Sequence, residues 1–290
     1  MEHQFGCCLW FDHNAEAAAN FYLETFEDSH RKETFYYVTD DHGKIGDTLT
    51  ITLELAGCEI MLLNGDDTFK PTPAISYVVN CENEQQLQFV WDQLNSQGET
   101  LMPLTDYPEL GKFGWTTDRF GFSWQVRLWD NLQTILPCIM FANQNYGLAQ
   151  AAIDEWIEIF GGKLNFMIKG KEERLRAAGF QLRGQDLIIM DRPEKQPFDF
   201  SMANSFYLYY KDQADIDEAW EAITKEGKEW PCGWMEDKYG VYWQTASSQL
   251  DDMLRDPDQE KAKRATLAMY EMKKIDLAKM QRAHDGIEEY

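Results

Sequence analysis

The sequence predicts an α+β fold: tandem β-α-β-β-β units that form curved mixed sheets, in two such domains followed by a C-terminal helical tail. Three observations support this prediction. A tryptophan-containing motif occurs twice, a helix that ends at glycine occurs twice, and both halves of the chain show the same order of helices and short apolar strands. Such internal self-similarity is typical of a duplicated fold.

The motif is the clearest sign of duplication. Residues 114–125 read GWTTDRFGFSWQ and residues 233–244 read GWMEDKYGVYWQ, with six identities at a constant offset of 119 residues. Trp91 and Trp220 lie 129 residues apart, which extends the repeat beyond the motif. Two tryptophans at fixed spacing rarely recur by chance, so the halves are interpreted as copies of one ancestral domain.

The first unit begins with an apolar strand at residues 7–11. A helix at about residues 15–26 follows, because its apolar side chains recur at helical spacing. Residues 48–55 alternate between polar and apolar side chains, and Gly57 predicts a turn into a further strand at residues 59–63.

The second unit begins with a strand at residues 75–79. The next helix, at residues 84–97, carries apolar residues on one face and ends at Gly98, a typical C-cap residue. Strands around Trp115 and at residues 122–126 complete the unit.

The second half repeats this order. Its predicted strands lie at residues 138–141, 187–190 and 205–210, and its helices lie at residues 150–160 and 216–226.

The predicted domains are residues 1–130 and residues 136–247. A linker is expected near residues 131–137. Residues 248–290 form the helical extension, with helices expected at residues 261–274 and 275–284. The apolar stripe of this extension fits two alternatives: packing on its own domain, or a subunit contact in a homodimer.

The composition excludes several classes of function. The chain of 290 residues has a formal net charge of −23, so its surface repels phosphate backbones and anionic lipids. Neither nucleic acid nor a membrane is therefore expected as a partner, and no apolar run predicts a membrane span. Residues 1–11 do not resemble a secretory signal. Six cysteines without a CxxC pair favour reduced thiols and a cytoplasmic location.

Several segments carry a family resemblance: residues 9–12 (LWFD), 15–18 (AEAA), 74–81 (AISYVVNC), the motif at 232–244 and the helix at 268–276. As a set they resemble the PhnB-like proteins of the vicinal-oxygen-chelate superfamily, which includes glyoxalase I, bleomycin-resistance proteins and extradiol dioxygenases. The resemblance implies sheets that curl into open cups with a ligand bound in the concavity. Some PhnB-like proteins have a name that mentions demethylubiquinone methyltransferase, yet no Gly-rich strand-turn-helix fingerprint for a nucleotide-like cofactor occurs here.

The resemblance also implies metal ligands on the cup strands in catalytic members, namely His, Gln or Glu around a divalent ion. The corresponding positions of this chain provide mainly thiols and amides: Cys7, Cys8, Cys138, Ala74, Asn204, Gln125 and Gln244. The five histidines are expected at the terminus, in turns, after a helix or in the tail, and none on a cup strand. We therefore predict no metal site and no cofactor, with a divalent metal as the alternative.

The candidate site residues are weaker signals. Glu54, in the alternating run at residues 48–55, is the candidate for an inward-facing general base, and its alternative is a solvent-exposed position. The candidate pocket residues are aromatic or amide side chains that a small-molecule site uses: Trp10, Trp115, Gln125, Trp234 and Gln244.

Three functions are consistent with the sequence. The first is a PhnB-like protein that binds a small molecule in the cup of one or both domains. The second is an enzyme of isomerase, lyase or dioxygenase type that uses a metal or a carboxylate such as Glu54. The third is an assembly scaffold in which the helical tail joins subunits.

Overall fold

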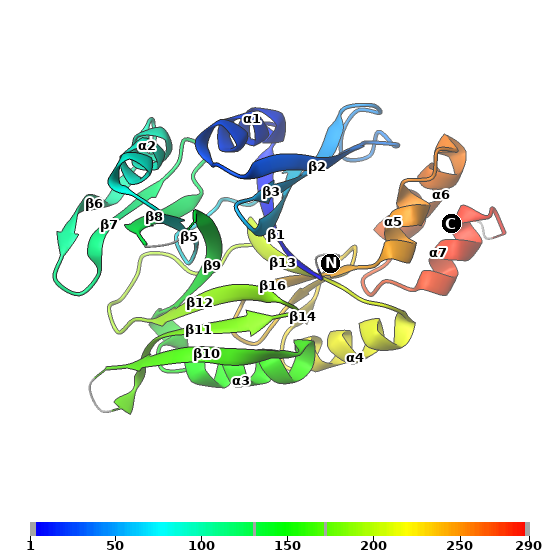
Figure 1. The fold of residues 1–290 in the computed structure, drawn as a ribbon. Coiled ribbons are helices and arrows are strands. Elements are labelled where there is room, and N and C mark those ends of the chain that lie inside the picture. The colour runs from blue at the N-terminus through cyan, green and yellow to red at the C-terminus, as the bar shows by residue number, and fades with distance from the viewer. Residues whose placement is uncertain (1–3, 130–131, 171–172, 288–290) are drawn as a thin grey trace.

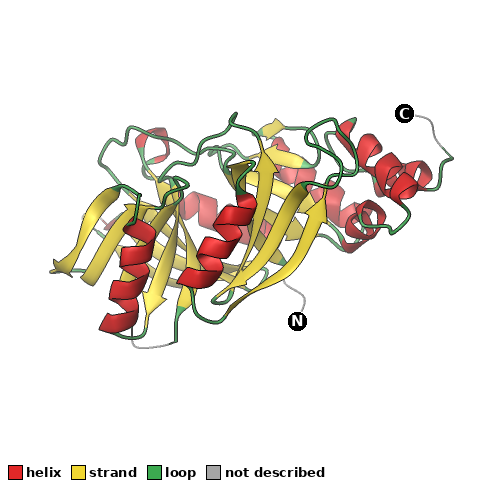
Figure 2. Ribbon diagram, turned by 90° about the horizontal axis from the view of Figure 1, so that it is seen from above, coloured by secondary structure: helices red, strands yellow, loops and turns green. Residues whose placement is uncertain are grey.

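Two curved eight-stranded mixed sheets form the centre of the molecule, and helices cover their outer faces (Figure 1). The computed structural model describes residues 4–129, 132–170 and 173–287. Three further helices gather at one end, near the C-terminus (Figure 2). This arrangement confirms the predicted α+β fold of four β-α-β-β-β units with a C-terminal helical tail. Within the described ranges, no helix has the length and apolar character needed to cross a bilayer.

The first half of the chain provides two units. The first unit is β1 (Phe5–Asp12), α1 (Ala15–Thr25), β2 (Ser29–Tyr36), β3 (Thr48–Leu55) and β4 (Cys58–Gly65). The second unit is β5 (Ile75–Cys81), α2 (Glu84–Asn95), β6 (Thr100–Tyr107), β7 (Gly111–Thr117) and β8 (Ser123–Leu128).

The second half provides the other two units. The third unit is β9 (Thr134–Phe141), α3 (Ala149–Phe160), β10 (Gly162–Lys169), β11 (Leu175–Leu182) and β12 (Gln185–Asp191), with a 3₁₀ turn at Asn143–Asn145 before α3. The fourth unit is β13 (Asn204–Tyr209), α4 (Gln213–Thr224), β14 (Lys228–Glu229), β15 (Trp234–Glu236) and β16 (Tyr242–Ala246).

Each sheet draws its strands from both halves of the chain. Sheet A has the order β14-β15-β16-β13-β1-β4-β3-β2, and sheet B has the order β10-β11-β12-β9-β5-β8-β7-β6. The joins are antiparallel: β1 pairs with β13, and β5 pairs with β9. The expectation that each half encloses its own cup is therefore wrong, because the first unit shares a sheet with the fourth and the second unit shares one with the third.

Several strands were given no range in the sequence prediction, namely β2, β6, β10, β11, β14, β15 and β16. Strands β2 and β6 lie at sheet edges, contain register shifts and carry charged residues or proline, so they lack clean alternation. The linker near residues 131–137 is also wrong in part, since residues 134–137 belong to β9. Residues 130 and 131, at the predicted domain boundary, lie outside the described residues, and the division into domains at these boundaries stays a prediction.

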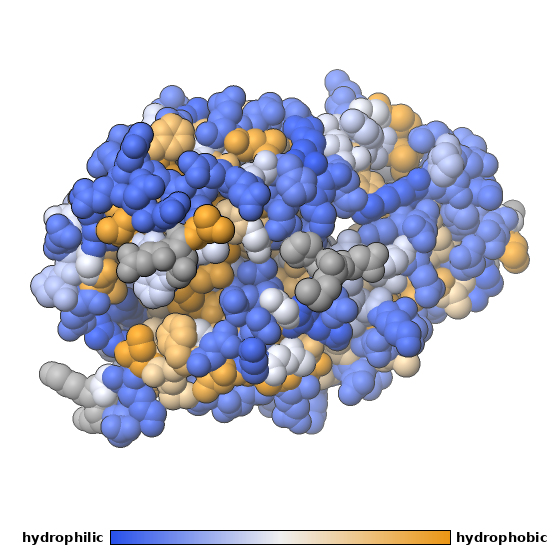
Figure 3. Space-filling model, in the orientation of Figure 1, coloured by the Kyte–Doolittle hydropathy of each residue, from blue (hydrophilic) through white to orange (hydrophobic). Residues whose placement is uncertain are grey.

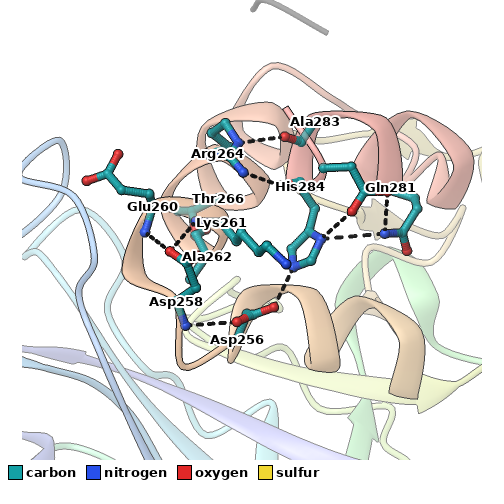
Figure 4. A network of polar contacts seen from close by, with 11 residues as sticks. Asp256, Asp258, Glu260, Lys261, Ala262, Arg264, Thr266, Gln281, Ala283 and His284 are labelled. Atoms are coloured by element: carbon teal, nitrogen blue, oxygen red, sulfur yellow. Dashed lines mark hydrogen bonds and ion pairs between the residues drawn. The ribbon is translucent and has the colours of Figure 1, made fainter. Parts of the chain in front are cut away.

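The C-terminal extension consists of α5 (Ser248–Leu254), α6 (Gln259–Tyr270) and α7 (Leu277–His284). Asp258 caps α6 by accepting hydrogen bonds from the backbone N–H groups of Glu260 and Lys261. His284 links the helices, because its Nε2 lies 2.9 Å from Asp256 and its carbonyl accepts from Arg264 at 2.6 Å (Figure 4). The extension therefore packs on its own chain, and the homodimer stays a prediction.

Each half has an aromatic core on the outer faces of its two units. In the first half, Trp124 packs against Tyr22 and Tyr77 with ring centroids 5.3 and 5.2 Å apart. In the second half, Trp243 packs against Trp156 at 5.4 Å, and both indoles are fully buried. Burial of such large rings provides most of the hydrophobic stabilisation between the units.

A buried aspartate of the repeated motif organises each core. Asp118 accepts hydrogen bonds from Tyr22 Oη at 2.7 Å, from Trp124 Nε1 at 2.8 Å and from two backbone N–H groups. Asp237 accepts from Trp156 Nε1 and Trp243 Nε1, both at 3.0 Å, and also from two backbone N–H groups. Burial raises the pKa of both carboxyls to about 6, and the hydrogen bonds oppose this rise.

We predict that Asp237→Asn costs more stability than Asp118→Asn. The new amide of residue 237 would face two indole N–H groups, which can only donate, whereas at residue 118 the Tyr22 hydroxyl can turn to accept. The expected losses in the free energy of unfolding are about 2–4 kcal/mol for Asp237→Asn and about 1–2 kcal/mol for Asp118→Asn.

Urea denaturation followed by tryptophan fluorescence measures both losses. Asp186→Asn is the control, because Asp186 is exposed and should change stability by less than about 0.5 kcal/mol. Equal losses at residues 118 and 237 would contradict the hydrogen-bond argument.

Candidate functional site

The concave face of sheet A, here called cup A, encloses a cavity of about 550 Å³. Its wall comes from β1 to β4 of the first unit and from β13, β15 and β16 of the fourth. Helices α5 and α6 close its open side, where Leu250, Met269 and Tyr270 complete the lining. Figure 1 shows these helices standing beside sheet A. The cavity has the size and enclosure of a site for a small organic molecule.

Aromatic rings form one wall of this cavity. Trp10 lies between Phe69 and Trp234, with ring centroids 5.2 and 6.3 Å away, in edge-to-face arrangements. Its Nε1 donates to the carbonyl of Asp66 at 2.8 Å, which fixes the indole. A Cβ atom at Gly65 would lie 2.0 Å from the Trp10 ring, so glycine is required for this close approach.

A polar cluster lies at the floor of cup A. The strand register sets Cys8 beside Ser205, and Gln244 stands on the neighbouring strand β16. Gln244 Nε2 donates to Ser205 Oγ at 2.8 Å. Burial raises the pKa of the Cys8 thiol to about 12, although hydrogen bonds with Gln244 and Ser205 act in the opposite direction. The floor is therefore polar and uncharged at neutral pH.

The concave face of sheet B, here called cup B, has the same cluster. Gln125 Nε2 donates to Ser76 Oγ at 2.8 Å and lies 3.8 Å from Cys138 Sγ. Burial raises the pKa of Cys138 to about 12 as well. The two clusters thus occupy equivalent positions in two related cups.

These clusters do not fit a divalent cation of the superfamily type. Their donors are an amide, a hydroxyl and a thiol that stays protonated, whereas zinc and similar ions need deprotonated thiols, neutral imidazoles or carboxylates. Across residues 4–129, 132–170 and 173–287, no group of three or more His, Cys, Asp or Glu side chains could hold a metal ion. We derive no metal-dependent step, and the absence of a metal site and cofactor stays a prediction.

A buried carboxylate that the sequence analysis missed lies beside cup A. Glu59 is 3% exposed, accepts a hydrogen bond from Tyr207 Oη at 2.7 Å and is ion-paired with Lys32. Strand alternation could have found it, because Glu59, Met61 and Leu63 share one face of β4. Glu54 lies opposite Glu59 in the β3–β4 pair but does not line the cavity, so its role as a base stays a prediction.

An ion-pair network holds the C-terminal extension over the cavity. Arg255, directly after α5, donates to Glu33 on β2 at 2.5 and 3.0 Å and lies 3.9 Å above the Phe35 ring. Asp251 lies 3.3 Å from Arg255 and accepts from Tyr209 Oη at 2.9 Å. The positive charge at this rim is therefore balanced by two carboxylates.

The structure divides the predicted pocket residues between the cups. Trp10, Trp234 and Gln244 all line the cavity of cup A. Trp115 and Gln125 lie opposite each other in the β7–β8 pair of sheet B, so they belong to cup B. The binding role of these residues stays a prediction.

The alkylation rate of the Cys232 thiol should reflect its environment in cup A. Cys232 is partly exposed and lines the cavity, whereas the other five cysteines are buried, and burial raises its pKa to about 11. Since only the thiolate reacts, its alkylation rate should rise about tenfold for each pH unit between pH 7 and pH 9.

Mass spectrometry after iodoacetamide treatment of the native protein measures this rate at each cysteine. Cys232→Ser is the control and should remove the signal. A rate that levels off below pH 9 would contradict the raised pKa.

Comparisons with known proteins agree with this architecture. The model of the family described as 3-demethylubiquinone-9 3-methyltransferase matches residues 3–127 and 133–246, one segment in each half. No curated protein gives a significant match.

Solved structures provide further similarities. A putative 3-demethylubiquinone-9 3-methyltransferase, PhnB protein, from Bacillus cereus is 37% identical over 43% of this chain and 98% of its own, with a TM-score of 0.41. Glyoxalase I from Zea mays is 10% identical over 83% of this chain and 91% of its own, with a TM-score of 0.57. A putative dioxygenase from Bacillus subtilis is 12% identical over 89% and 88%, with a TM-score of 0.51. The last two similarities show the fold alone.

Proposed function

This chain belongs to the 3-demethylubiquinone-9 3-methyltransferase family, the PhnB-like proteins of the vicinal-oxygen-chelate superfamily, and we propose that it binds a small, largely apolar organic molecule in cup A. The main support is the half-open cavity of about 550 Å³ between sheet A and the C-terminal helices. The predicted family resemblance is confirmed, while the ligand and the activity belong to this proposal.

The lining supports a neutral ligand with aromatic or aliphatic surface. Trp10, Phe69 and Trp234 provide ring faces and edges, and Met61 and Met269 provide adaptable apolar contacts. The floor cluster of Cys8, Ser205 and Gln244 adds a few fixed polar groups that can orient a carbonyl or hydroxyl.

The proposal concerns binding, although the family description mentions methyl transfer. An enzymatic role with Glu54 as a base, or with a metal, remains the alternative from the sequence, and a turnover assay on a bound ligand would test it. A cytoplasmic location is part of the proposal, supported by six free cysteines.

A neutral fluorescent probe tests the cavity. Phenylnaphthylamine should bind the native protein with enhanced fluorescence, and Trp234→Ala should weaken its binding about tenfold, because an indole contact is lost. Fluorescence titration gives the dissociation constant.

Trp115→Ala is the matched control, since Trp115 occupies the equivalent position in cup B. It should leave the affinity for phenylnaphthylamine within about twofold of the native value. Equal weakening by both substitutions, or no binding to the native protein, would overturn the proposal for cup A.

A further inference from the structure

The two cups can be compared position by position, because their strand registers are equivalent. In cup A, Ser205 pairs with Cys8, and in cup B, Ser76 pairs with Cys138. Gln244 and Gln125 occupy the same position of the repeated motif. The floors are therefore matched, and any difference in ligand must come from the residues around them.

The residues on either side of the floor differ in charge. Two positions after the floor glutamine, cup A has Ala246 and cup B has Arg127. Cys8 pairs with Met61 on β4, and Cys138 pairs with Ile188 on β12. Four residues further along the chain, cup A has Gly65 at the end of β4, and cup B has Arg192 directly after β12. Cup B thus carries two arginines where cup A has no charge.

Both arginines belong to the concave face of sheet B. Arg127 Nε donates to Asn80 Oδ1 at 2.6 Å, and its guanidinium lies 4.3 Å from the centroid of Trp129. Arg192 lies 3.7 Å from Met190 Sδ. Both side chains are partly buried, and the positive charge of each acts to lower the pKa of Cys138, so both approach the floor cluster.

Neither guanidinium forms an ion pair with a carboxylate of the described residues. In cup A, by contrast, Arg255 is paired with Glu33 and Asp251. A partly buried cation without a counter-charge is costly, and an anionic ligand would compensate it.

Exposed apolar side chains lie on the same face of sheet B as the two arginines. Phe166 and Ile168 on β10 are each 50% exposed, and Trp129 is 48% exposed. The ring of Phe166 lies over Gly179, where a Cβ atom would be 2.2 Å away. Figure 3 shows apolar side chains gathered around a hollow between the α2 side and the β10 side of the molecule. Helices α5 to α7 stand beside sheet A, and no helix of the described residues stands in the same way beside sheet B (Figure 1).

We propose that cup B binds a small organic anion with an apolar body, whose negative group is held by Arg127 and Arg192 beside the Cys138–Ser76–Gln125 cluster. Guanidinium groups suit carboxylate, sulfonate and phosphate groups because they donate several hydrogen bonds in one plane. The apolar body rests on Phe166, Ile168 and Trp115. This site is separate from the cavity of cup A and does not depend on it.

Two probes that differ by one charged group test this proposal. Anilinonaphthalene sulfonate carries the skeleton of phenylnaphthylamine plus a sulfonate. The substitutions Arg127→Ala and Arg192→Ala together should weaken sulfonate binding about tenfold or more, since charge-assisted hydrogen bonds are lost. The affinity for phenylnaphthylamine should stay unchanged, which also shows that the double variant is folded.

Three further measurements complete the test. Arg119→Ala removes an exposed arginine outside the cups and should leave sulfonate binding unchanged. Arg127→Lys, in the presence of native Arg192, should retain more affinity than Arg127→Ala because the charge remains. Salt should weaken binding of the sulfonate and not of phenylnaphthylamine.

The proposals for the two cups are contradicted by different results. Loss of sulfonate binding in Trp234→Ala, with full binding in the arginine variants, would place the anion in cup A and overturn the proposal for cup B. Unchanged sulfonate affinity in the double arginine variant would overturn it as well. Failure of phenylnaphthylamine to bind would count against cup A alone.

Discussion

The antiparallel pairing of β1 with β13 and of β5 with β9 is the constraint on which the rest of the structure depends. These two joins connect the first half of the chain with the second, since Cys8 and Ser205 are 197 residues apart and Ser76 and Cys138 are 62 residues apart, and they create both concave surfaces. Cys8 reaches Ser205 and Gln244 only through the first join, and Cys138 reaches Ser76 only through the second. Neither half has a complete cup by itself. The two halves of the duplicated sequence thus build both sheets together and do not fold as two independent copies.

The repeated motif serves the two faces of each sheet differently. Its first tryptophan, Trp115 or Trp234, lies on the concave side, and its second, Trp124 or Trp243, lies in the aromatic core on the outer side. The aspartate between them accepts four hydrogen bonds and fixes the turn against the core. Since most of the motif stabilises the core, its repetition predicts architecture well and ligand chemistry poorly.

The sequence was sufficient for the elements with strong periodicity or strong turn signals. Helices such as α2 and α3 carry one apolar face, and the repeated motif predicted the four units. Edge strands such as β2 were not predicted, because they form by hydrogen bonding to a neighbouring strand and their sequences lack a regular alternation of polar and apolar residues. For the candidate site, the sequence predicted Trp10, Trp234 and Gln244 as pocket residues, and all three line the cavity of cup A. It could not predict that Cys8 lies beside Ser205 or that α5 lies over cup A, because those contacts depend on pairing between distant segments.

The two cups have the same floor residues and differ in the residues that flank the floor. A shared floor of cysteine, serine and glutamine costs little free energy to bury, because its polar side chains are uncharged and the glutamine and serine form a hydrogen bond with each other. The flanking positions are free to change: glycine at residue 65 permits the close approach of Trp10, whereas arginine at residue 192 places a charge at the same position of cup B. Helices α5 and α6 partly cover the aromatic rings of cup A, whereas the two arginines of cup B form no ion pair with a carboxylate in the part of the chain that the structure describes. Because the floor is equivalent in both cups, the proposed difference in ligand between the cups depends on the flanking residues.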